Sequence, residues 1–594
     1  MSRHLRSYTL LGMLIIFSMI LAACPAPVAP AGGGEAAAPP AAAEATAAPA
    51  AEAPAAEAAD APKVLRVNLG TFPDILDPQK SSFSGEIANL TLAYEGLTRQ
   101  DAALDTVPAA AESWTYNDDA TQLVFTLRDG LKYSDGSLLN AARFAYSIGR
   151  NIDPTTAGEY AAITDEILGA PEWRACGEDA AACETAKAQV MESVMASHGD
   201  GAACTGYDDA ACNTLTLQFS KAAPYFHVVM SLWVTFPAKE ELITAAGENW
   251  WTDAANHIGN GPYVLETLEQ GVRTVYTPNA NYWGPAANVS IDFAYITDSA
   301  VAFEAYKNDE FDIISLASED LEVVQADPVL SLEANIYPGS CTFAVMFHQL
   351  KEPFTDPKVR EAFAYALDRE GWVQDVLRGL GSPTLTWIPP GYPGYDAEES
   401  RWGFDAEAAK QAIADSSYGS VENLPPITMT FQDTPRNRTR YEWLAAKFAE
   451  VLGVEAKLDP VESTTYTALT KDINTAPQMF ILGWCADYPD PQNWLSVYWK
   501  TGAFGERIGY SNPELDALLN SADTELDTVK RADLYAQAQR MLTDSAPVAF
   551  MWNNVNARMV KPWVTGIVKT PQDSSWPGAI SPWTIDIDTA MQSK

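Results

Sequence analysis

The chain has 594 residues, 10% aromatic side chains including 17 tryptophans, and a formal net charge of −40. Nucleic acid and anionic lipid surfaces repel so acidic a chain, which argues against both as partners. The length exceeds that at which a single hydrophobic core stops growing, so two or three domains are expected. The charge alone does not identify a ligand, because it fits attraction of cationic solutes and, more simply, a solubilising surface.

The N-terminal residues predict export and lipid attachment. A short basic start is followed by an uncharged apolar run over residues 8–23, which is too short for a membrane span. The run ends in Leu-Ala-Ala-Cys24, which resembles the bacterial lipobox, where the cysteine receives a diacylglyceryl group after cleavage. We therefore expect residues 1–23 to be a lipoprotein signal peptide and Cys24 to be lipidated. The alternative is an ordinary signal peptide with an incidental cysteine.

Residues 24–63 are predicted to be a disordered tether. They are almost entirely Ala, Pro, Glu and Gly, a composition with too little large apolar surface to offset the entropy of ordering. Such a chain spans on the order of 50 to 100 Å. No later segment has 18 uninterrupted apolar residues, so the lipid is the expected membrane attachment, on the extracytoplasmic face, in the periplasm or at the cell surface.

The folded body begins with elements of mixed type. Residues 65–69 alternate as in a strand, and a helical stretch after them runs up to Tyr94. A second module follows, with a strand over 123–127 and a helix that Asn140 is expected to cap. This module runs to about residue 221 and contains a cysteine-rich insertion whose residues 184–196 look helical.

Two strand-helix-strand units lie further along the chain. The first comprises residues 289–296, 299–307 and 311–314. A strand over 341–347 and a helix entered at Asp356-Pro357 follow it. The second unit comprises residues 427–431, about 436–452 and 454–458, with Gly453 ending its helix. Two separate α/β units predict two lobes, and ligands usually bind in the cleft where lobes meet.

The cysteines favour disulfides in an exported protein. Besides Cys24 there are six, and none forms a CxxC or pairs with one of the five histidines at metal-ligand spacing. No metal site or cofactor is therefore predicted. Four of the six, Cys176, Cys183, Cys204 and Cys212, crowd into the insertion, and the sequence leaves their three possible pairings open.

Motifs of enzyme chemistry are missing from the sequence. It contains no nucleophile elbow, zinc-protease helix, phosphate loop or dinucleotide fingerprint, and Gly259-Asn260-Gly261 is too weak a pattern to indicate phosphate binding. Carboxylates are so frequent that the pattern alone does not exclude a glycosidase. We nevertheless expect a protein that is not an enzyme.

The most informative segment runs from Gly483 to Pro491. It follows the apolar run 479–482, which predicts a strand, and prolines then end regular structure, so these residues are expected at a strand end that opens into a loop. In a closed, water-poor cleft the Asp487 carboxylate costs several kcal/mol unless it is neutralised, and a ligand ammonium group is a natural partner. The alternatives are that Asp487 caps a loop and that Trp484 is plain core.

Several motifs resemble one family along nearly the whole folded body. They are Tyr94-Glu95-Gly96-Leu97, Phe125-Thr126-Leu127-Arg128, Tyr133-Ser134-Asp135-Gly136, Asn260-Gly261-Pro262-Tyr263, Pro353-Phe354-Thr355-Asp356-Pro357, Val555-Asn556-Ala557-Arg558 and, most specifically, Trp484-Cys485-Ala486-Asp487-Tyr488. The chain is similar to the peptide/nickel-binding solute-binding proteins of ABC importers (bacterial extracellular solute-binding protein family 5), and most of all to their oligopeptide-binding members. The resemblance implies an α/β, two-lobed periplasmic-binding-protein-like fold (class II, type C) with an additional domain inserted in lobe I.

The same resemblance implies a domain order. The expected segments are the N-terminal stretch of lobe I (64–107), inserted domain II (108–221, with the cysteine-rich insertion 172–214), the middle stretch of lobe I (222–339), lobe II (340–545) and the C-terminal stretch of lobe I (546–594). The chain would then cross between the lobes twice, and those crossings would form the hinge.

The family also implies roles for individual residues. Its members receive the peptide α-ammonium on the aspartate of the Trp-Cys-Ala-Asp-Tyr run. The ligand-binding residues implied here are Asp487, Trp484, Cys485, Gly483, Tyr160 and Glu95, and a disulfide is implied between Cys341 and Cys485. Two departures leave the ligand open: Ile481 stands where the oligopeptide receptor has an arginine, and Ser463 where it has a pocket tryptophan.

The expected function is therefore capture of a peptide or peptide-like solute and its delivery to the permease of an ABC importer by a monomeric, lipid-anchored receptor. Nucleic acid is not an expected partner. The alternatives are the same fold binding an oligosaccharide or a metal chelate, a secreted hydrolase, and a lipoprotein chaperone or adhesin.

Overall fold

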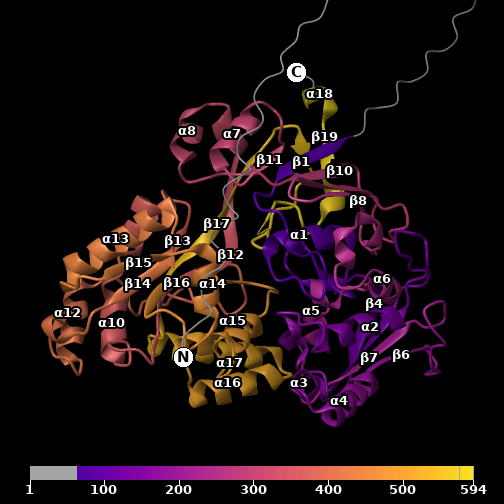
Figure 1. The fold of residues 1–594 in the computed structure, drawn as a ribbon, viewed down its shortest axis with the longest axis horizontal. Helices are drawn as coiled ribbons and strands as arrows, with labels where there is room; N and C mark the ends of the chain where they lie inside the picture. Colours follow the sequence, from indigo (N-terminus) through magenta and orange to yellow (C-terminus); the bar gives the residue numbers. More distant parts are fainter. Residues whose placement is uncertain (1–62, 574, 593–594) are drawn as a thin grey trace, which may run out of the picture. The chain divides into compact units, whose positions relative to one another are not determined.

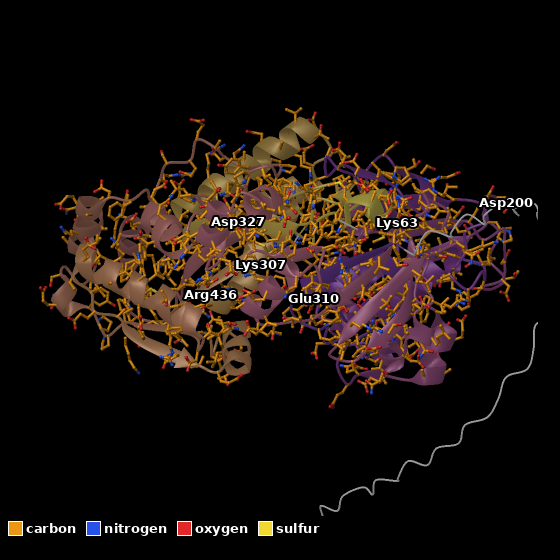
Figure 2. All side chains as sticks on the ribbon, turned by 90° about the horizontal axis from the view of Figure 1, so that it is seen from above. Lys63, Asp200, Lys307, Glu310, Asp327 and Arg436 are labelled. Atoms are coloured by element: carbon orange, nitrogen blue, oxygen red, sulfur yellow. A yellow bond between two sulfur atoms is a disulfide. The ribbon has the colours of Figure 1, made fainter. Side chains whose placement is uncertain are left out.

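The computed structural model describes residues 63–573 and 575–592 (Figure 1). The predicted signal peptide, the lipidation of Cys24 and residues 24–62 of the predicted tether lie outside these residues. Lys63, predicted as the last residue of the tether, belongs to the folded body, since it forms an ion pair with Asp586 at 2.7 Å. None of the described helices combines the length and apolar character needed to cross a membrane. Asp200, Lys307, Glu310 and Arg436, labelled in Figure 2, are among the exposed charged side chains.

The largest sheet has eleven strands in the order β15-β14-β16-β12-β17-β11-β1-β10-β9-β8, with β13 also paired to β17. Its central pair consists of β12 (Ala334–Phe347) and β17 (Val548–Val560). These strands lie side by side although they are far apart in sequence (Figure 1), and they pair antiparallel from Ala334 opposite Met559 to Met346 opposite Val548. The register shifts twice between Pro338 and Ala344.

The first predicted strand-helix-strand unit is confirmed. Strand β1 (Val64–Asn68) pairs parallel with β10 (Ser290–Ala294) on one side and with β11 (Ile313–Ser315) on the other. Helix α7 (Ser299–Lys307) connects β10 to β11, and the Asp298 carboxylate accepts hydrogen bonds from its first backbone N–H groups. Strands β9 (Arg273–Pro278) and β8 (Tyr263–Glu269) extend the sheet antiparallel to its edge.

A separate four-stranded sheet, β4-β5-β7-β6, forms within the predicted inserted domain. Its strands are β4 (Ala111–Tyr116), β5 (Gln122–Leu127), β6 (Val194–Ser197) and β7 (Thr214–Gln218). Helix α4 spans Ala180–Ser193, so the helix predicted over 184–196 is wrong at its end, where the chain enters β6 and pairs with β7.

The predicted cap of α2 (Ala141–Ile152) also needs correction. Asn140 occupies the N-cap position, but its side chain makes no capping hydrogen bond. Its amide instead donates to the carbonyl oxygens of Gly206, Tyr207 and Asp209 and so anchors the cysteine-rich insertion. Disulfides within that insertion join Cys176 to Cys183 and Cys204 to Cys212.

The second strand-helix-strand unit is confirmed with shifted bounds. Strand β14 (Thr428–Gln432) pairs parallel with β15 (Lys457–Val461), and α13 (Pro435–Leu452) connects them. Gly453 ends the helix with φ of 77°, a left-handed conformation that favours glycine. The strand predicted over 454–458 begins three residues later, at Lys457.

The remaining strands and helices complete the fold. The strands are β2 (Thr98–Gln100), β3 (Thr106–Pro108), β13 (Ser382–Pro383), β16 (Met479–Cys485), β18 (Val564–Thr565) and β19 (Asp586–Ile587). The helices are α1 (Ser84–Ala93), α3 (Ala170–Arg174), α5 (Phe226–Val229), α6 (Glu240–Ala246), α8 (Leu321–Ala326), α9 (Leu330–Glu333), α10 (Pro357–Tyr365), α11 (Arg369–Gly371), α12 (Ala406–Asp415), α14 (Ser463–Lys471), α15 (Pro491–Trp499), α16 (Pro513–Thr524), α17 (Thr528–Asp544) and α18 (Thr589–Gln592).

The buried side chains form two groups of cores. One group draws on residues 65–324 and 557–587, and the other on residues 344–552. We call the regions that surround these cores lobe I (63–339 and 554–592) and lobe II (340–553). The first half of β17 packs in the lobe II cores and its second half in those of lobe I, so this crossing falls inside the strand. Tyr488 is an exception, since it belongs to lobe II in sequence but packs in the lobe I core.

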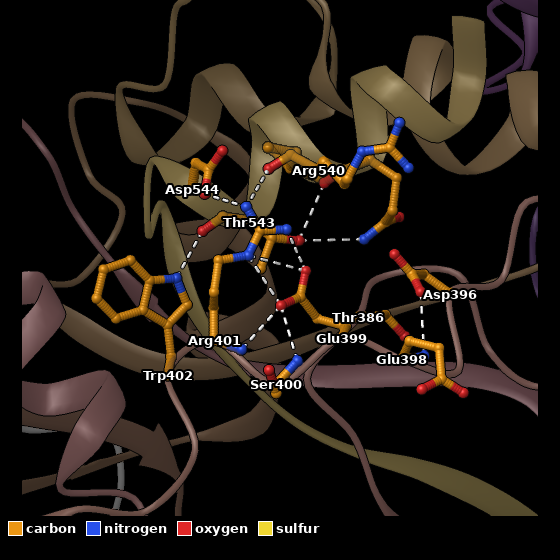
Figure 3. Close-up of polar contacts among 12 residues, drawn as sticks. Thr386, Asp396, Glu398, Glu399, Ser400, Arg401, Trp402, Arg540, Thr543 and Asp544 are labelled. Carbon is orange, nitrogen blue, oxygen red and sulfur yellow. Dashed lines mark hydrogen bonds and ion pairs between the residues drawn. The ribbon is translucent and has the colours of Figure 1, made fainter. Parts of the chain in front are cut away.

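A polar network fixes the loop before α12 to the end of α17 (Figure 3). Arg401 forms ion pairs with Glu399 and Asp544, and its guanidinium donates to the Arg540 carbonyl at 3.2 Å. The indole N–H of Trp402 donates to the Thr543 carbonyl at 2.7 Å. The long segment between β13 and α12 is thereby held against the helices of lobe II.

Candidate functional site

Asp487 lies just beyond the end of β16 and faces lobe I. Its Oδ2 accepts a hydrogen bond from Asn493 Nδ2 at 2.8 Å, and its Oδ1 accepts one from Tyr160 Oη of lobe I at 3.2 Å. Among the described residues, no lysine or arginine forms an ion pair with this half-buried carboxylate. Burial raises the pKa of Asp487 to about 6, and the two hydrogen bonds only partly oppose that rise.

Asn493 holds the carboxylate in place. It is fully buried in α15, whose start is fixed by Pro491 and by the Asp490 carboxylate, which accepts from the Gln492 N–H at 2.8 Å. The Asn493 Oδ1 accepts from the backbone N–H of Asp487 at 3.1 Å and from Trp484 Nε1 at 3.2 Å. Our sequence interpretation missed this residue, although Asp490-Pro491 is a strong helix start that would have placed it in the first turn.

The strand that carries the site is longer than predicted. Gly483, Trp484 and Cys485 belong to β16 itself, and the loop begins only at Ala486. Cys485 lies directly opposite Cys341 of β12, and the two are joined by a disulfide. The Ala486 N–H donates to the Ser340 carbonyl at 2.9 Å, so the pairing continues one residue past the disulfide.

Gly483 allows β16 and the neighbouring strand β12 to approach closely. A Cβ atom at this position would lie 2.6 Å from Phe343 Cδ1 and 2.8 Å from the Thr342 carbonyl oxygen. Both distances are shorter than van der Waals contact, so β16 passes here only with glycine.

Trp484 begins an aromatic wall. Its ring centroid lies 4.9 Å from that of Phe504 and 5.3 Å from that of Tyr498. Tyr498 packs in turn on Trp387, at 4.8 Å, in the segment held by the network of Figure 3. Trp484 is buried, so its indole serves both as core and as the support of Asn493.

A cavity of about 1150 Å³ adjoins the carboxylate. Residues from both lobes line it, among them Tyr160, Glu166 and Tyr225 from lobe I and Tyr488, Gln492 and Phe504 from lobe II. Asp487 does not itself line the cavity, but its hydrogen-bond partner Tyr160 and its chain neighbour Tyr488 do. A space of this volume is slightly larger than the roughly 300 to 1,000 Å³ that small-molecule sites usually have.

The lobes also touch beside this cavity. Gln492 Nε2 donates to Tyr225 Oη at 3.2 Å, and Tyr225 Oη donates to Glu166 Oε1 at 2.6 Å. On the exposed side, Lys471 forms an ion pair with Glu159 at 3.3 Å. Tyr160 and Asp487 therefore meet within a wider polar interface.

Glu95 is not brought to this cavity. It lines a separate space of about 190 Å³, and its buried carboxylate accepts from Tyr282 Oη at 2.8 Å and from Trp283 Nε1 at 2.6 Å. It also forms an ion pair with Arg99 at 3.2 Å. Burial raises the pKa of Glu95. With these partners, the Glu95 carboxylate is largely satisfied within lobe I.

Nothing in the structure explains how the two departures from the family pattern, Ile481 and Ser463, affect the choice of ligand. Ile481 is half-buried in β16, where its carbonyl accepts from Tyr466 Oη at 2.8 Å. The side chain of Ser463 lies outside those that the structure describes. In the described part of the chain, no group of three or more His, Cys, Asp or Glu side chains is placed to hold a metal ion.

Residues 105–506 match the family model described as bacterial extracellular solute-binding proteins, family 5. The chain belongs to this family. Two relatives of this solute-binding protein come from Escherichia coli K12: the periplasmic murein peptide-binding protein MppA and the periplasmic oligopeptide-binding protein OppA. MppA is 27% identical over 517 residues, which cover 85% of this chain and 90% of MppA. OppA is 27% identical over 524 residues, which cover 86% of this chain and 90% of OppA.

A solved structure of the Escherichia coli murein tripeptide-binding protein MppA superimposes on this solute-binding protein with a TM-score of 0.73. The superposition is 25% identical in sequence and covers 89% of this chain and 98% of MppA. The two-lobed α/β fold implied by the sequence motifs is thereby confirmed.

Proposed function

We propose that this solute-binding protein captures peptides between its two lobes and delivers them to the permease of an ABC importer. The observation that carries the proposal is Asp487, a half-buried carboxylate with no cationic partner among the described residues, hydrogen-bonded across the lobes to Tyr160. The α-ammonium group of a peptide would neutralise it and remove the cost of keeping it charged. Trp484, Gly483 and Cys485 position this carboxylate, and Tyr160 closes it from lobe I.

Closure would occur about the strands that cross between the lobes. The register of β12 and β17 is irregular between Pro338 and Ala344, where the chain passes from lobe I to lobe II. A ligand that contacts both lobes favours the closed form by its differential contacts, and the importer would recognise that form. The inserted domain supplies Tyr160, so it takes part in closure. No ligand contact is proposed for Glu95, because Arg99, Tyr282 and Trp283 hold its carboxylate in a separate space of lobe I.

The proposal places the receptor outside the cytoplasm. Cleavage before Cys24 and its acylation would anchor a monomer to the extracytoplasmic face of the membrane, with residues 24–63 as a tether. Both relatives named above are periplasmic binding proteins. No catalytic role is proposed for any residue.

The test is the identity of the bound solute. The protein, purified without denaturation, is unfolded and its released small molecules are analysed by mass spectrometry. In parallel, tryptophan fluorescence is titrated with a random tri- to pentapeptide library and with a panel of oligosaccharides and metal chelates. Released peptides and saturable binding of the peptide library support the proposal. Binding of sugars or chelates alone would contradict the proposal and indicate a receptor for a non-peptide solute. Cleavage of the peptides during incubation would contradict it and indicate a hydrolase.

A further inference from the structure

The cationic side chains around the large cavity differ in whether they form an ion pair with a carboxylate. Five of the described residues that line it are lysine or arginine. Four of these form ion pairs: Arg174 with Asp165, Lys221 with Glu166, Lys471 with Glu159 and Lys500 with Asp523. Arg507 is the fifth, and no carboxylate of the described chain lies within ion-pair distance of it, its neighbour Glu506 included.

The guanidinium of Arg507 is oriented by one aromatic residue. Its Nε donates to the Phe504 carbonyl oxygen at 3.0 Å, and its Cζ lies 5.2 Å from the centroid of the Phe504 ring. A guanidinium has five N–H donors in a planar fork, and this contact uses only the one on Nε. The two terminal amino groups remain for a planar anion, and a carboxylate matches their spacing.

Arg507 and Asp487 stand at opposite ends of one chain of contacts. The Asp487 carboxylate is bonded to Asn493, whose oxygen accepts from the Trp484 indole. Trp484 packs on Phe504, and Phe504 lies under Arg507. Of this series, Phe504 and Arg507 line the cavity, and Asp487 adjoins it through Tyr160 and Tyr488.

We propose that Arg507 binds the terminal carboxylate of the ligand, so that the receptor takes zwitterionic peptides with a free C-terminus and an apolar residue against Phe504. This inference rests on the proposed function. It adds that both chain ends are read, the ammonium by Asp487 and the carboxylate by Arg507.

The test compares three forms of one random tri- to pentapeptide library: free acids, C-terminal amides and N-acetylated acids. Binding is measured by tryptophan fluorescence on the wild-type protein, on Arg507→Gln and on Arg174→Gln. Arg174 is the matched control, because it is an arginine of the same cavity that is already paired with Asp165. We expect the wild-type protein to bind acids about ten- to a hundredfold more tightly than amides, as charge-assisted hydrogen bonds usually require.

Arg507→Gln should lose this preference, whereas Arg174→Gln should keep it, and N-acetylation should weaken binding to all three proteins. Equal binding of acids and amides by the wild-type protein overturns the inference even if Arg507→Gln does not fold. So does an acid preference that survives in a folded Arg507→Gln. If N-acetylation still weakens binding in those cases, the proposed function stands. Failure of every form of the library to bind the wild-type protein overturns both.

Discussion

Replacing Asp487 by asparagine should have opposite effects on binding and on stability. In the unliganded protein, burial raises the pKa of this carboxyl from 3.8 to about 6. A pKa difference of about two corresponds to about 3 kcal/mol of unfavourable free energy for the ionised form at pH 7. Asparagine is uncharged and removes this cost, but its amide cannot accept both hydrogen bonds, which costs about 1 kcal/mol. The variant should therefore be more stable than wild type by about 2 kcal/mol.

Binding should change in the other direction. The variant loses a charge-assisted contact with the ligand ammonium. Its affinity for peptides with a free amino terminus should therefore fall by about ten- to a hundredfold. N-acetylated peptides should bind the variant and the wild-type protein alike. The assays are thermal unfolding of the unliganded proteins and fluorescence titration with each form of the peptide library.

Asp490→Asn is the matched control. The Asp490 carboxylate accepts two hydrogen bonds from Arg531, both at 2.8 Å, so its charge is neutralised within the fold. This variant should lose stability without changing the preference for a free amino terminus. The reasoning is refuted if Asp487→Asn lowers stability by as much as Asp490→Asn, or if it binds free and acetylated peptides in the wild-type ratio.

Three further outcomes are expected. Since the pKa of Asp487 in the fold, about 6, lies above its ordinary value, the contribution of this carboxyl to stability is complete below about pH 4 and is lost as the pH rises through 6. The melting-temperature advantage of Asp487→Asn at pH 7 should thus vanish near pH 4, and a constant advantage would contradict this. Gly483→Ala should lower stability by about 1 to 3 kcal/mol in thermal unfolding, because its Cβ meets the Phe343 ring, and an unchanged melting temperature would contradict the geometry. Replacing Cys341 and Cys485 together by serine should lower the free energy of unfolding in denaturant by about 4 to 5 kcal/mol, because their disulfide closes a loop with a sequence separation of 144; a loss below about 1 kcal/mol would count against this.

Local patterns were sufficient to predict the strands and helices of both strand-helix-strand units. Helix α7 coincides with its predicted range, because Asp298 caps it and its apolar stripe is regular. The helix predicted over 184–196 failed at its end, where pairing of β6 with β7 takes over from helix propensity. Asn140 was predicted as a cap, but carbonyl groups more than 60 residues away bind its side chain. Such long-range contacts leave no signature in a short window of sequence.

At the candidate site, too, local motifs predicted some residues, whereas others became apparent only from their contacts in the structure. The motif around Asp487 and the tyrosine at position 160 came from the sequence, and the structure brings the two within hydrogen-bond distance. Asn493 and Arg507 were missed, because neither lies in the segments on which the family resemblance depends and their importance depends on which neighbours have partners. Glu95 was expected beside the ligand, but a cluster of Arg99 and two aromatic residues binds its carboxylate elsewhere in lobe I.

The most direct measurement is the number of protons released when a peptide binds. Isothermal titration calorimetry at pH 6, repeated in buffers of different ionisation enthalpy, gives this number. With a pKa of about 6, the Asp487 carboxyl is half protonated in the free protein and must be fully ionised beside a ligand ammonium. The wild-type protein should therefore release about half a proton per peptide, and Asp487→Asn about half a proton less. Identical proton release by the two proteins would contradict the claim that this carboxylate receives the amino terminus of the ligand.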